Sequence, residues 1–364
     1  MPLGTDEQIA SGLLDYLRAS LKVPGLSYAE TPARITGGFE TSVFGFRLAG
    51  APEPLYGRLI LRLFAETEDP ERARGEAAVQ NAISALGYAA PRVFIAETGK
   101  QMLGGVFLIM ERMPGHTLTR EFEGLGRGRG ARELAGLLMR MPAMLREFSG
   151  MMADAQFRLH QLPVEPLIRA VESAGLPAEA FTFEGRLRWL RLTNSQAELA
   201  GLLPAVAWLE ANRPPERRLA ICHCDFQPFN ILVEGGRVTG VIDWANTTIG
   251  DPALDLGFTV GDIATVPIEV PRPLQPIFRA MMKFAGRRYL RAYCRRRPLD
   301  DEAVRYYQVF GCMSQLTWAG DAIVHGYKGG AFQSASGIAL LVSHIRALTR
   351  IELRLRFPTA GIDL

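Results

Sequence analysis

The spacing of hydrophobic residues separates a strand-like first part of the chain from a helix-like second part. Apolar residues that alternate, or that form short runs ending at glycine or proline, predict strands at residues 35–46, 59–64 and 106–113. Apolar residues that recur every three or four positions predict helices at residues 72–86, 132–145, 148–162, 187–212 and 300–325. The pattern therefore predicts an α+β protein that becomes mainly helical after about residue 113.

A short hairpin is expected inside the helical part, and it carries the most informative polar residues. Apolar runs at 219–222 and 229–233 are followed by a turn at 234–237 and a return strand at 238–242. Asp225 and Asn230 flank the loop before the hairpin, and Asp243 follows the return strand. We expect these three oxygen-bearing side chains to converge at one edge of the hairpin.

These residue types suit the transfer of a phosphoryl group from a metal-bound nucleotide. Such a transfer needs a carboxylate that orients the attacking hydroxyl and accepts its proton, which is the role expected of Asp225. It also needs oxygen ligands for Mg²⁺, which Asn230 and Asp243 can supply. The alternative interpretation treats Asp225 and Asn230 as ordinary turn residues and Asp243 as a helix cap. The occurrence of all three in this order favours the metal–phosphate site.

The motifs in this region resemble those of the aminoglycoside phosphotransferase and choline kinase-like family. The matching residues are His223-x-Asp225-x-x-x-x-Asn230, Ile242-Asp243-Trp244 and Gly250-Asp251-Pro252-x-x-Asp255-Leu256. The chain departs from the family at Cys224, where a glycine is usual, and at Gln227, where many members have histidine. Neither position is the expected base or a metal ligand.

The resemblance implies a bilobal, protein kinase-like fold with a small antiparallel-sheet N-lobe (1–113) and a larger helical C-lobe (114–364). It implies that ATP or GTP, with Mg²⁺, donates a phosphoryl group to a hydroxyl of a small molecule, and that the acceptor binds in the C-lobe. It also implies structural roles for three residues. His223 supports the catalytic loop, Asp251 lies at a turn, and Asp255 opens a helix where it can bond backbone amides.

A cation in the first part of the chain is expected to bind the nucleotide phosphates. In the strand at 59–64, Arg62 shares one face with Ile60 and Phe64, and an arginine among apolar residues needs a partner or an anionic ligand. Kinases place a lysine at this strand position, and Arg62 stands there in this chain. Glu76, in the predicted helix at 72–86, is its expected partner, although a surface ion pair without function is the alternative.

Two further segments are expected to contact the nucleotide. The glycines Gly37 and Gly38 lie in a turn between strands, where backbone amides can approach phosphates, although a plain turn explains them equally well. By resemblance, the strand at 106–113 runs into the hinge between the lobes. Backbone groups around Met110, Glu111 and Met113 would then bind the adenine.

Composition limits the class of protein. The 364 residues, 48% hydrophobic and 22% charged with a net charge of +3, suit an ordinary globular protein of two lobes and give no case for nucleic-acid binding. Arginines cluster at 287–297 in a helical pattern, where a solvated face is expected.

We see no targeting segment or membrane span, and expect a cytoplasmic protein. The oligomeric state cannot be predicted.

Other enzyme classes fit the motifs less well. Cys222, His223 and Cys224 suggest a zinc site or a Cys–His nucleophile, but no second ligand pair lies downstream and the four cysteines are scattered. A protein kinase would need an activation loop between Asp243 and Asp251, and no segment there resembles one. The main alternative from another class is a catalytically silent kinase-like module that binds a nucleotide or a partner.

The acceptor is the least constrained part of the prediction. Residues 250–364 carry fifteen basic and ten acidic residues, and this positive charge argues mildly against a polycationic acceptor such as an aminoglycoside. Trp244 could help to wall an apolar pocket, as for a macrolide, although tryptophan in a helical region is more often core. Asp321 is a candidate acid in the cleft.

Overall fold

The computed structural model describes residues 5–35, 41–64, 69–99, 102–122, 131–266, 275–327, 331–357 and 362–363. The chain divides into two compact units. Unit 1 contains Met1–Pro114, Glu165–Ala178 and Gly240–Ala245, and unit 2 contains Gly115–Val164, Glu179–Thr239 and Asn246–Leu364. The first break lies one residue beyond the predicted boundary, but the two later returns to unit 1 are not apparent from the sequence.

Unit 1 is built on a five-stranded antiparallel sheet with the strand order β1-β2-β3-β5-β4. Its strands are β1 (Ser27–Ile35), β2 (Ser42–Ala49), β3 (Arg58–Leu63), β4 (Val93–Glu97) and β5 (Phe107–Glu111). Its helices are α1 (Asp6–Leu21), α2 (Pro70–Ala85) and α4 (Glu165–Ser173). The sequence pattern had predicted β2, β3, β5 and α2, but not β4 or α4.

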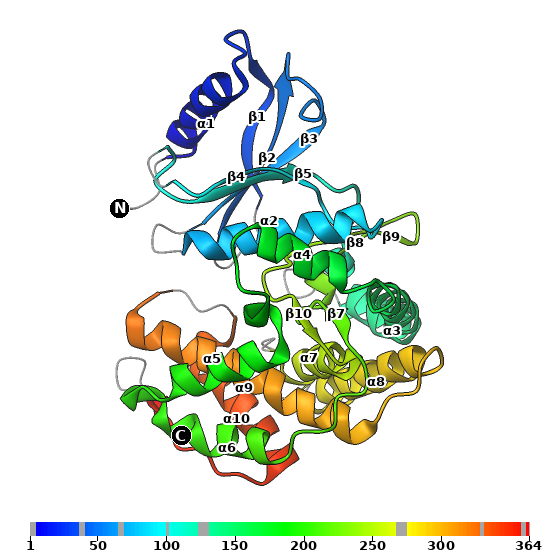
Figure 1. The fold of residues 1–364 in the computed structure, drawn as a ribbon. Helices are drawn as coiled ribbons and strands as arrows, with labels where there is room; N and C mark the ends of the chain where they lie inside the picture. Colours follow the sequence, from blue (N-terminus) through cyan, green and yellow to red (C-terminus); the bar gives the residue numbers. More distant parts are fainter. Residues whose placement is uncertain are drawn as a thin grey trace. The chain divides into compact units, whose positions relative to one another are not determined.

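The two faces of this sheet pack against different helices (Figure 1). On one face, Leu59, Leu61 and Leu63 of β3 join a buried cluster with α1, whose Thr5 and Gln8 form a capping box at the helix start. On the other face, Ile60 and Phe64 belong to a cluster that includes residues of α2. The alternation of β3 therefore directs Arg62 to the face covered by α2.

Unit 2 is mainly helical. Its α-helices are α3 (Ala131–Leu159), α5 (Phe183–Asn194), α6 (Leu203–Ala211), α7 (Pro252–Thr265), α8 (Gln275–Cys294), α9 (Asp301–His325) and α10 (Ala335–Thr349). Short strands and 3₁₀ turns connect them: β6 (His116–Thr117), η1 (Leu118–Phe122), η2 (Ala178–Phe181), η3 (Ala197–Leu202), β7 (Ala220–Cys222), η4 (Pro228–Asn230), β8 (Ile231–Glu234), β9 (Arg237–Val241), β10 (Thr248–Gly250), η6 (Ala331–Gln333), β11 (Arg356–Phe357) and β12 (Ile362–Asp363). The first residue of η2 and the last two residues of β9 belong to unit 1. Its core gathers around α9, with α5, α6, α7 and α10 packed against it.

The predicted helix boundaries are wrong in two places. Residues 132–145 and 148–162, expected as two helices, form the single helix α3, which contains Pro142. Residues 187–212, expected as one helix, are broken after α5 and resume at α6, where a proline occupies the first turn. Proline is tolerated there but lacks the N–H that would continue a helix from α5. The hairpin of β8 and β9 forms as predicted, with Gly235 and Gly236 both at positive φ.

Within the described ranges, none of the helices combines the length and the apolar composition needed to cross a membrane.

Two helical glycines allow a matched test of the packing in unit 2. A Cβ on Gly257 of α7 would lie 2.7 Å from the backbone carbon of Tyr307 in α9, whereas a Cβ on Gly286 of α8 would meet nothing closer than 3.8 Å. We expect Gly257→Ala to destabilise the protein by about 1–3 kcal/mol through overpacking. Gly286→Ala should stabilise it by up to about 1 kcal/mol, because alanine favours helix.

Urea unfolding followed by circular dichroism measures both variants. Equal changes in the two would show that the close approach of α7 and α9 is not a constraint on the fold.

Candidate active site

Arg62 and Glu76 form the ion pair expected from the sequence. One nitrogen of the Arg62 guanidinium contacts Oε1 of Glu76, whose side chain is 1% exposed at the centre of α2. The guanidinium also lies over the ring of Phe64, 5.2 Å from its centroid. Because both partners are largely buried, the pair holds the arginine in one orientation. Its role in binding phosphates stays a prediction.

Asp243 is a second anionic partner of the same arginine. Its Oδ1 lies 3.2 Å from Nη2 of Arg62, and its side chain is 40% exposed. The backbone of Asp243 has φ +66°, a left-handed conformation that aspartate tolerates better than most residues. The structure thus joins three of the predicted site residues, Arg62, Glu76 and Asp243, within unit 1.

The segment that carries Asp243 is fixed by its neighbours in unit 1. The amide of Val241 donates to the carbonyl of Ala89 at 2.7 Å, and Nε1 of Trp244 donates to the carbonyl of Val241 at 2.9 Å. Trp244 is 1% exposed and packs edge-on against Tyr88. This burial leaves Trp244 no surface for an acceptor, so the structure favours a packing role that orients Asp243 instead.

Asp225 and Asn230 lie together in the loop between β7 and β8 of unit 2. Nδ2 of Asn230 donates to Oδ2 of Asp225 at 2.7 Å and to its backbone carbonyl at 3.0 Å. Nε2 of Gln227 donates to the other carboxylate oxygen, Oδ1, at 2.7 Å. With its nitrogen turned to Asp225, Asn230 keeps its amide oxygen as the atom suited to a hard cation. Convergence of this loop with Asp243, which belongs to unit 1, stays a prediction.

The unusual cysteine in the motif occupies a left-handed position. Cys224 has φ +57°, a left-handed conformation that glycine, the residue expected there from the family resemblance, adopts without strain. Its side chain is 3% exposed and belongs to the core of unit 2. Cys224 thus combines a buried thiol with a left-handed backbone conformation, which costs a non-glycine residue about 1–2 kcal/mol.

A buried carboxylate anchors the start of this loop. Asp255 accepts hydrogen bonds from the amides of His223 at 2.9 Å and Cys224 at 2.7 Å. Oδ2 of Asp255 also lies 3.0 Å from Nε2 of His160, whose Nδ1 lies 2.6 Å from the hydroxyl of Tyr293. Asp255 lies in the first turn of α7 and binds backbone amides as expected, but these amides do not belong to its own helix. Asp251 caps α7 through the amide of Ala253, whereas Asp255 binds amides of the distant loop.

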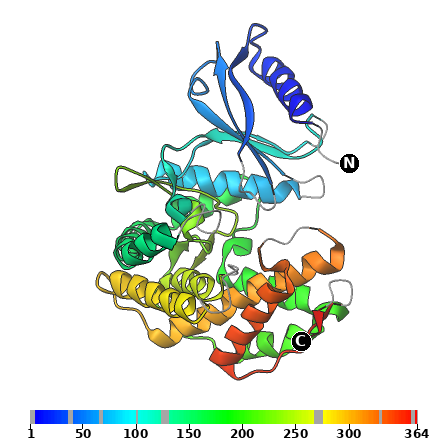
Figure 2. The ribbon, with the colours of Figure 1, turned by 180° about the vertical axis from the view of Figure 1, so that it is seen from behind.

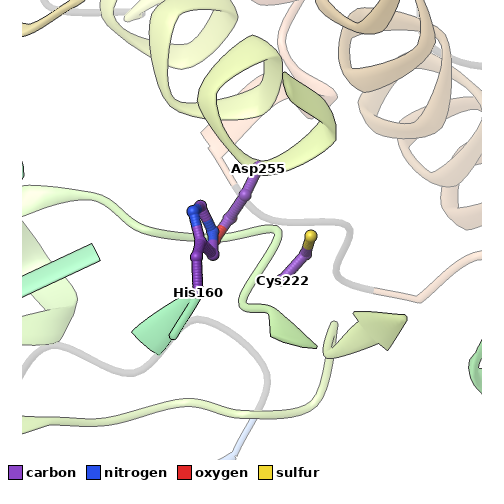
Figure 3. A group of neighbouring side chains, drawn as sticks. All are labelled: His160, Cys222 and Asp255. Carbon is purple, nitrogen blue, oxygen red and sulfur yellow. The ribbon is translucent and has the colours of Figure 1, made fainter. Parts of the chain in front are cut away.

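The electrostatics of this cluster suit a structural anchor. Burial alone would raise the pKa of Asp255, but the hydrogen bond and charge of His160, followed by His223, hold it below its usual value. Figure 3 shows the side chains of His160, just after α3, and Asp255, in α7, meeting each other, with Cys222 of β7 beside them. Although their ligand atoms lie within 4.8 Å of one another, the oxygens of Asp255 are already used by amides.

The thiols do not support nucleophilic or zinc chemistry. Burial raises the pKa of Cys222 and of Cys224, which disfavours the thiolate that either chemistry requires. Sγ of Cys222 instead lies within 3.8 Å of the carbonyls of Ala220, Gly250 and Asp251.

The remaining predicted residues are placed less informatively. Met110 is buried at the end of β5, Glu111 is exposed, and Met113 follows the strand. Asp321 contacts Tyr327 and His325 of its own segment, so its carboxylate is engaged locally. Gly37 and Gly38 lie outside the described residues.

Comparison with known proteins decides the family. Residues 32–299 match the model of the phosphotransferase enzyme family. The chain belongs to this family. Membership makes it an enzyme, a small-molecule kinase.

Individual members of the phosphotransferase family agree with this assignment. An aminoglycoside 3'-phosphotransferase of Streptomyces fradiae is 28% identical over 233 residues, which span 62% of this chain and 77% of that protein. The ethanolamine kinase of Plasmodium vivax has a similar fold (TM-score 0.57, 15% identity, 92% of this chain and 86% of that one). So does a mutant of the aminoglycoside phosphotransferase APH(4)-Ia in complex with AMP-PNP and hygromycin B (TM-score 0.55, 18% identity, 94% and 98%). These likenesses confirm the kinase-like α+β fold.

Sequence reasoning missed the partners that hold the site residues in place. Arg62 pairs with Asp243, and His160 contacts both Tyr293 and Asp255. Each of these contacts joins residues more than ninety positions apart, so none lies within a single motif. By the family resemblance, His160 was expected only to close a helix, and neither His160 nor Tyr293 was expected to contact Asp255.

The anchor leads to a prediction about pH. Asp255→Asn should lower the free energy of unfolding at pH 7 by about 3 kcal/mol or more, because a buried hydrogen-bonded charge is removed beside its partners. Since the pKa of Asp255 is lowered in the folded protein, its contribution is present above the unfolded value of about 3.9 and is lost as the pH falls through the folded value. Wild type and variant should therefore converge in acid.

Urea titrations from pH 7 to below about pH 4 test this convergence. Asp15→Asn, at an exposed position of α1, is the control and should follow wild type throughout. A gap between Asp255→Asn and wild type that persists unchanged in acid would contradict the role of the charge.

Proposed function

We propose that the protein transfers the γ-phosphoryl group of ATP, or of GTP, to a hydroxyl of a small molecule, with Mg²⁺ as the metal. The observation that carries this proposal is the arrangement of Arg62 between Glu76 and Asp243, which presents a fixed cation beside an exposed carboxylate. A nucleotide and a hydroxylated acceptor are further supported by the similar structure that contains AMP-PNP and hygromycin B.

The donor set fits a hard divalent cation. The carboxylate of Asp243 and the amide oxygen of Asn230 are the oxygen ligands that Mg²⁺ prefers, and neither sulfur nor imidazole is among the proposed ligands. When bound, Mg²⁺ would neutralise charge on the phosphates and hold them for in-line transfer. Asn230 would keep the metal close to Asp225, because the two side chains are hydrogen-bonded.

The other residues have distinct tasks in the proposed reaction. Asp225 orients the acceptor hydroxyl and accepts its proton at a carboxylate oxygen. Arg62, held by Glu76, binds phosphate oxygens, and Gly37 and Gly38 would cover them with backbone amides. Backbone groups around Met110, Glu111 and Met113 would bind the base of the nucleotide. Tests of the acceptor should include aminoglycosides, macrolides and small amino alcohols.

The metal assignment is tested by nucleotide binding. Asp243→Ala should abolish the Mg²⁺-dependent binding of ATP and GTP in isothermal titration, because it removes the carboxylate ligand, while the protein stays folded. Asp15→Ala removes an exposed carboxylate elsewhere in unit 1 and should bind like wild type. Unchanged binding in Asp243→Ala would refute its role as a ligand.

Turnover separates a kinase from a silent nucleotide-binding module. Asp225→Asn should bind nucleotide normally but lower kcat by about 10²–10⁴-fold, the usual contribution of a general base. The release of ADP in the presence of each acceptor measures this loss. Nucleotide binding without turnover on any hydroxylated acceptor would favour the silent module.

A further inference from the structure

A second feature of unit 2 is a strongly basic segment that the proposed reaction does not use. Residues 275–297 contain eight basic residues and no acidic ones: Arg279, Lys283, Arg287, Arg288, Arg291, Arg295, Arg296 and Arg297. The whole chain carries a net charge of only +3, so the rest of the protein is net acidic. Such an asymmetry creates a local positive potential that can attract an acidic partner.

The packing of α8 turns most of these charges outward. Ala285, Gly286, Tyr289 and Tyr293 are buried, and α8 packs against α3 along this side; the two helices lie side by side in both views of the fold (Figures 1 and 2). The exposed side carries Lys283, Arg287, Arg291 and, directly after the helix, Arg295, at intervals of four residues. With a rise of about 1.5 Å per residue, neighbouring charges are about 6 Å apart along the axis.

Side chains on this side of α8 surround two open hollows. One hollow of about 270 Å³ is lined by Lys283, Phe284, Arg287, Arg288 and Arg291. A second hollow, of about 260 Å³, is lined by Arg288, Arg291, Arg295 and Arg296 together with Arg146 of α3. Because Arg288 and Arg291 line both, the hollows are neighbours. We call the surface formed by Arg146, Lys283, Arg287, Arg288, Arg291 and Arg295 the α8 basic groove.

Among the residues that the structure describes, the basic side chains of the α8 basic groove have no acidic partners. Arg296 pairs with Asp154, and Arg297 donates to Gln161. Within the described part of the chain, by contrast, no ion pair joins an acidic side chain to any of the six basic residues of the groove. The Nε atom of Arg288 is buried without a hydrogen-bond partner among the described atoms. A partner that supplied anionic oxygens would pair with the exposed cations of the groove.

We propose that the α8 basic groove binds an acidic polypeptide segment in an extended conformation. Alternate side chains of an extended chain are about 6.6 Å apart, which matches the spacing of about 6 Å between Lys283, Arg287 and Arg291. Carboxylates at alternate positions can therefore each meet a cation. Phe284, 45% exposed at the edge of the first hollow, offers an apolar contact for one residue of the segment.

The surface fits other polyanions less well. Single-stranded nucleic acid binds through rows of aromatic side chains on which bases stack, whereas Phe284 is the one aromatic residue that lines either hollow. A membrane-bound helix inserts a continuous apolar face, whereas the exposed apolar residues Ile277 and Phe284 lie only in the first half of α8 and the hollows are concave. Alternating carboxylates on a flexible chain suit a charged groove of this shape.

The proposal is tested with a defined peptide. A fluorescent peptide of about twelve residues, alternating glutamate and alanine around a central phenylalanine, is long enough for the groove at about 3.3 Å per residue. Fluorescence anisotropy measures its affinity for wild-type protein. The same peptide with glutamine in place of glutamate, an oligothymidine of similar length and phosphatidylserine vesicles serve as comparison probes.

Two double variants with the same change in charge separate the groove from the rest of the surface. Arg287→Glu with Arg291→Glu should weaken binding of the acidic peptide at least about tenfold, because attraction becomes repulsion at two central positions. Arg169→Glu with Arg305→Glu, which reverses two exposed arginines elsewhere, should change it less than about twofold. Circular dichroism checks that both variants fold.

The outcomes are distinct. Binding of the glutamate peptide, weaker binding of the glutamine peptide and selective loss in the groove variant support the proposal. No binding by wild type, or equal loss in both variants, overturns it. Tighter binding of the oligothymidine or the vesicles, lost in the groove variant, would also overturn it and assign the groove to nucleic acid or to a membrane surface.

Discussion

The candidate catalytic loop depends on one buried carboxylate. Asp255 has no contact with solvent, and its two oxygens together accept two backbone amides and meet one histidine. A buried charge is tolerated only when all its oxygens are satisfied, so α7, the end of α3 and the start of the loop have to stay in register. Because Asp255 fixes the amides of His223 and Cys224, it also fixes where the next residues of the loop, including Asp225, begin. The chemistry of the loop therefore rests on a contact that takes no part in it.

Much of the fold could be predicted because local patterns carried it. The alternation of β3 correctly assigned Arg62 to the face with Ile60 and Phe64, and so pointed to α2 and Glu76. The glycine pair at 235–236 correctly marked a hairpin, because both residues need positive φ. The family motifs identified the fold. These successes all depend on short-range geometry, in which side-chain direction follows from residue spacing.

What the sequence could not provide were contacts between distant segments. Trp244 stood beside the candidate site in the sequence, yet it is buried against Tyr88, which no pattern indicated. The local pattern suggested that Asp255 binds amides of its own helix. Its partners are instead the amides of His223 and Cys224, about thirty residues earlier, which the local pattern does not indicate. Helix breaks were equally hidden, since the apolar spacing at 187–212 continues through the break while the backbone does not. Pattern shows which face of an element is apolar, but not which segment will cover it.

The contact between Arg62 and Asp243 has a consequence for how ligands would bind. In the structure the Arg62 guanidinium, already paired with Glu76, also lies 3.2 Å from the Asp243 carboxylate. If Asp243 ligates a cation and Arg62 binds phosphate, both must exchange this partner for another. Each ligand then removes part of the cost that the other would meet alone, so metal and nucleotide affinities are linked by a shared free energy of coupling. The Arg62–Asp243 ion pair would therefore favour binding of the metal and the phosphates together over the binding of either one separately.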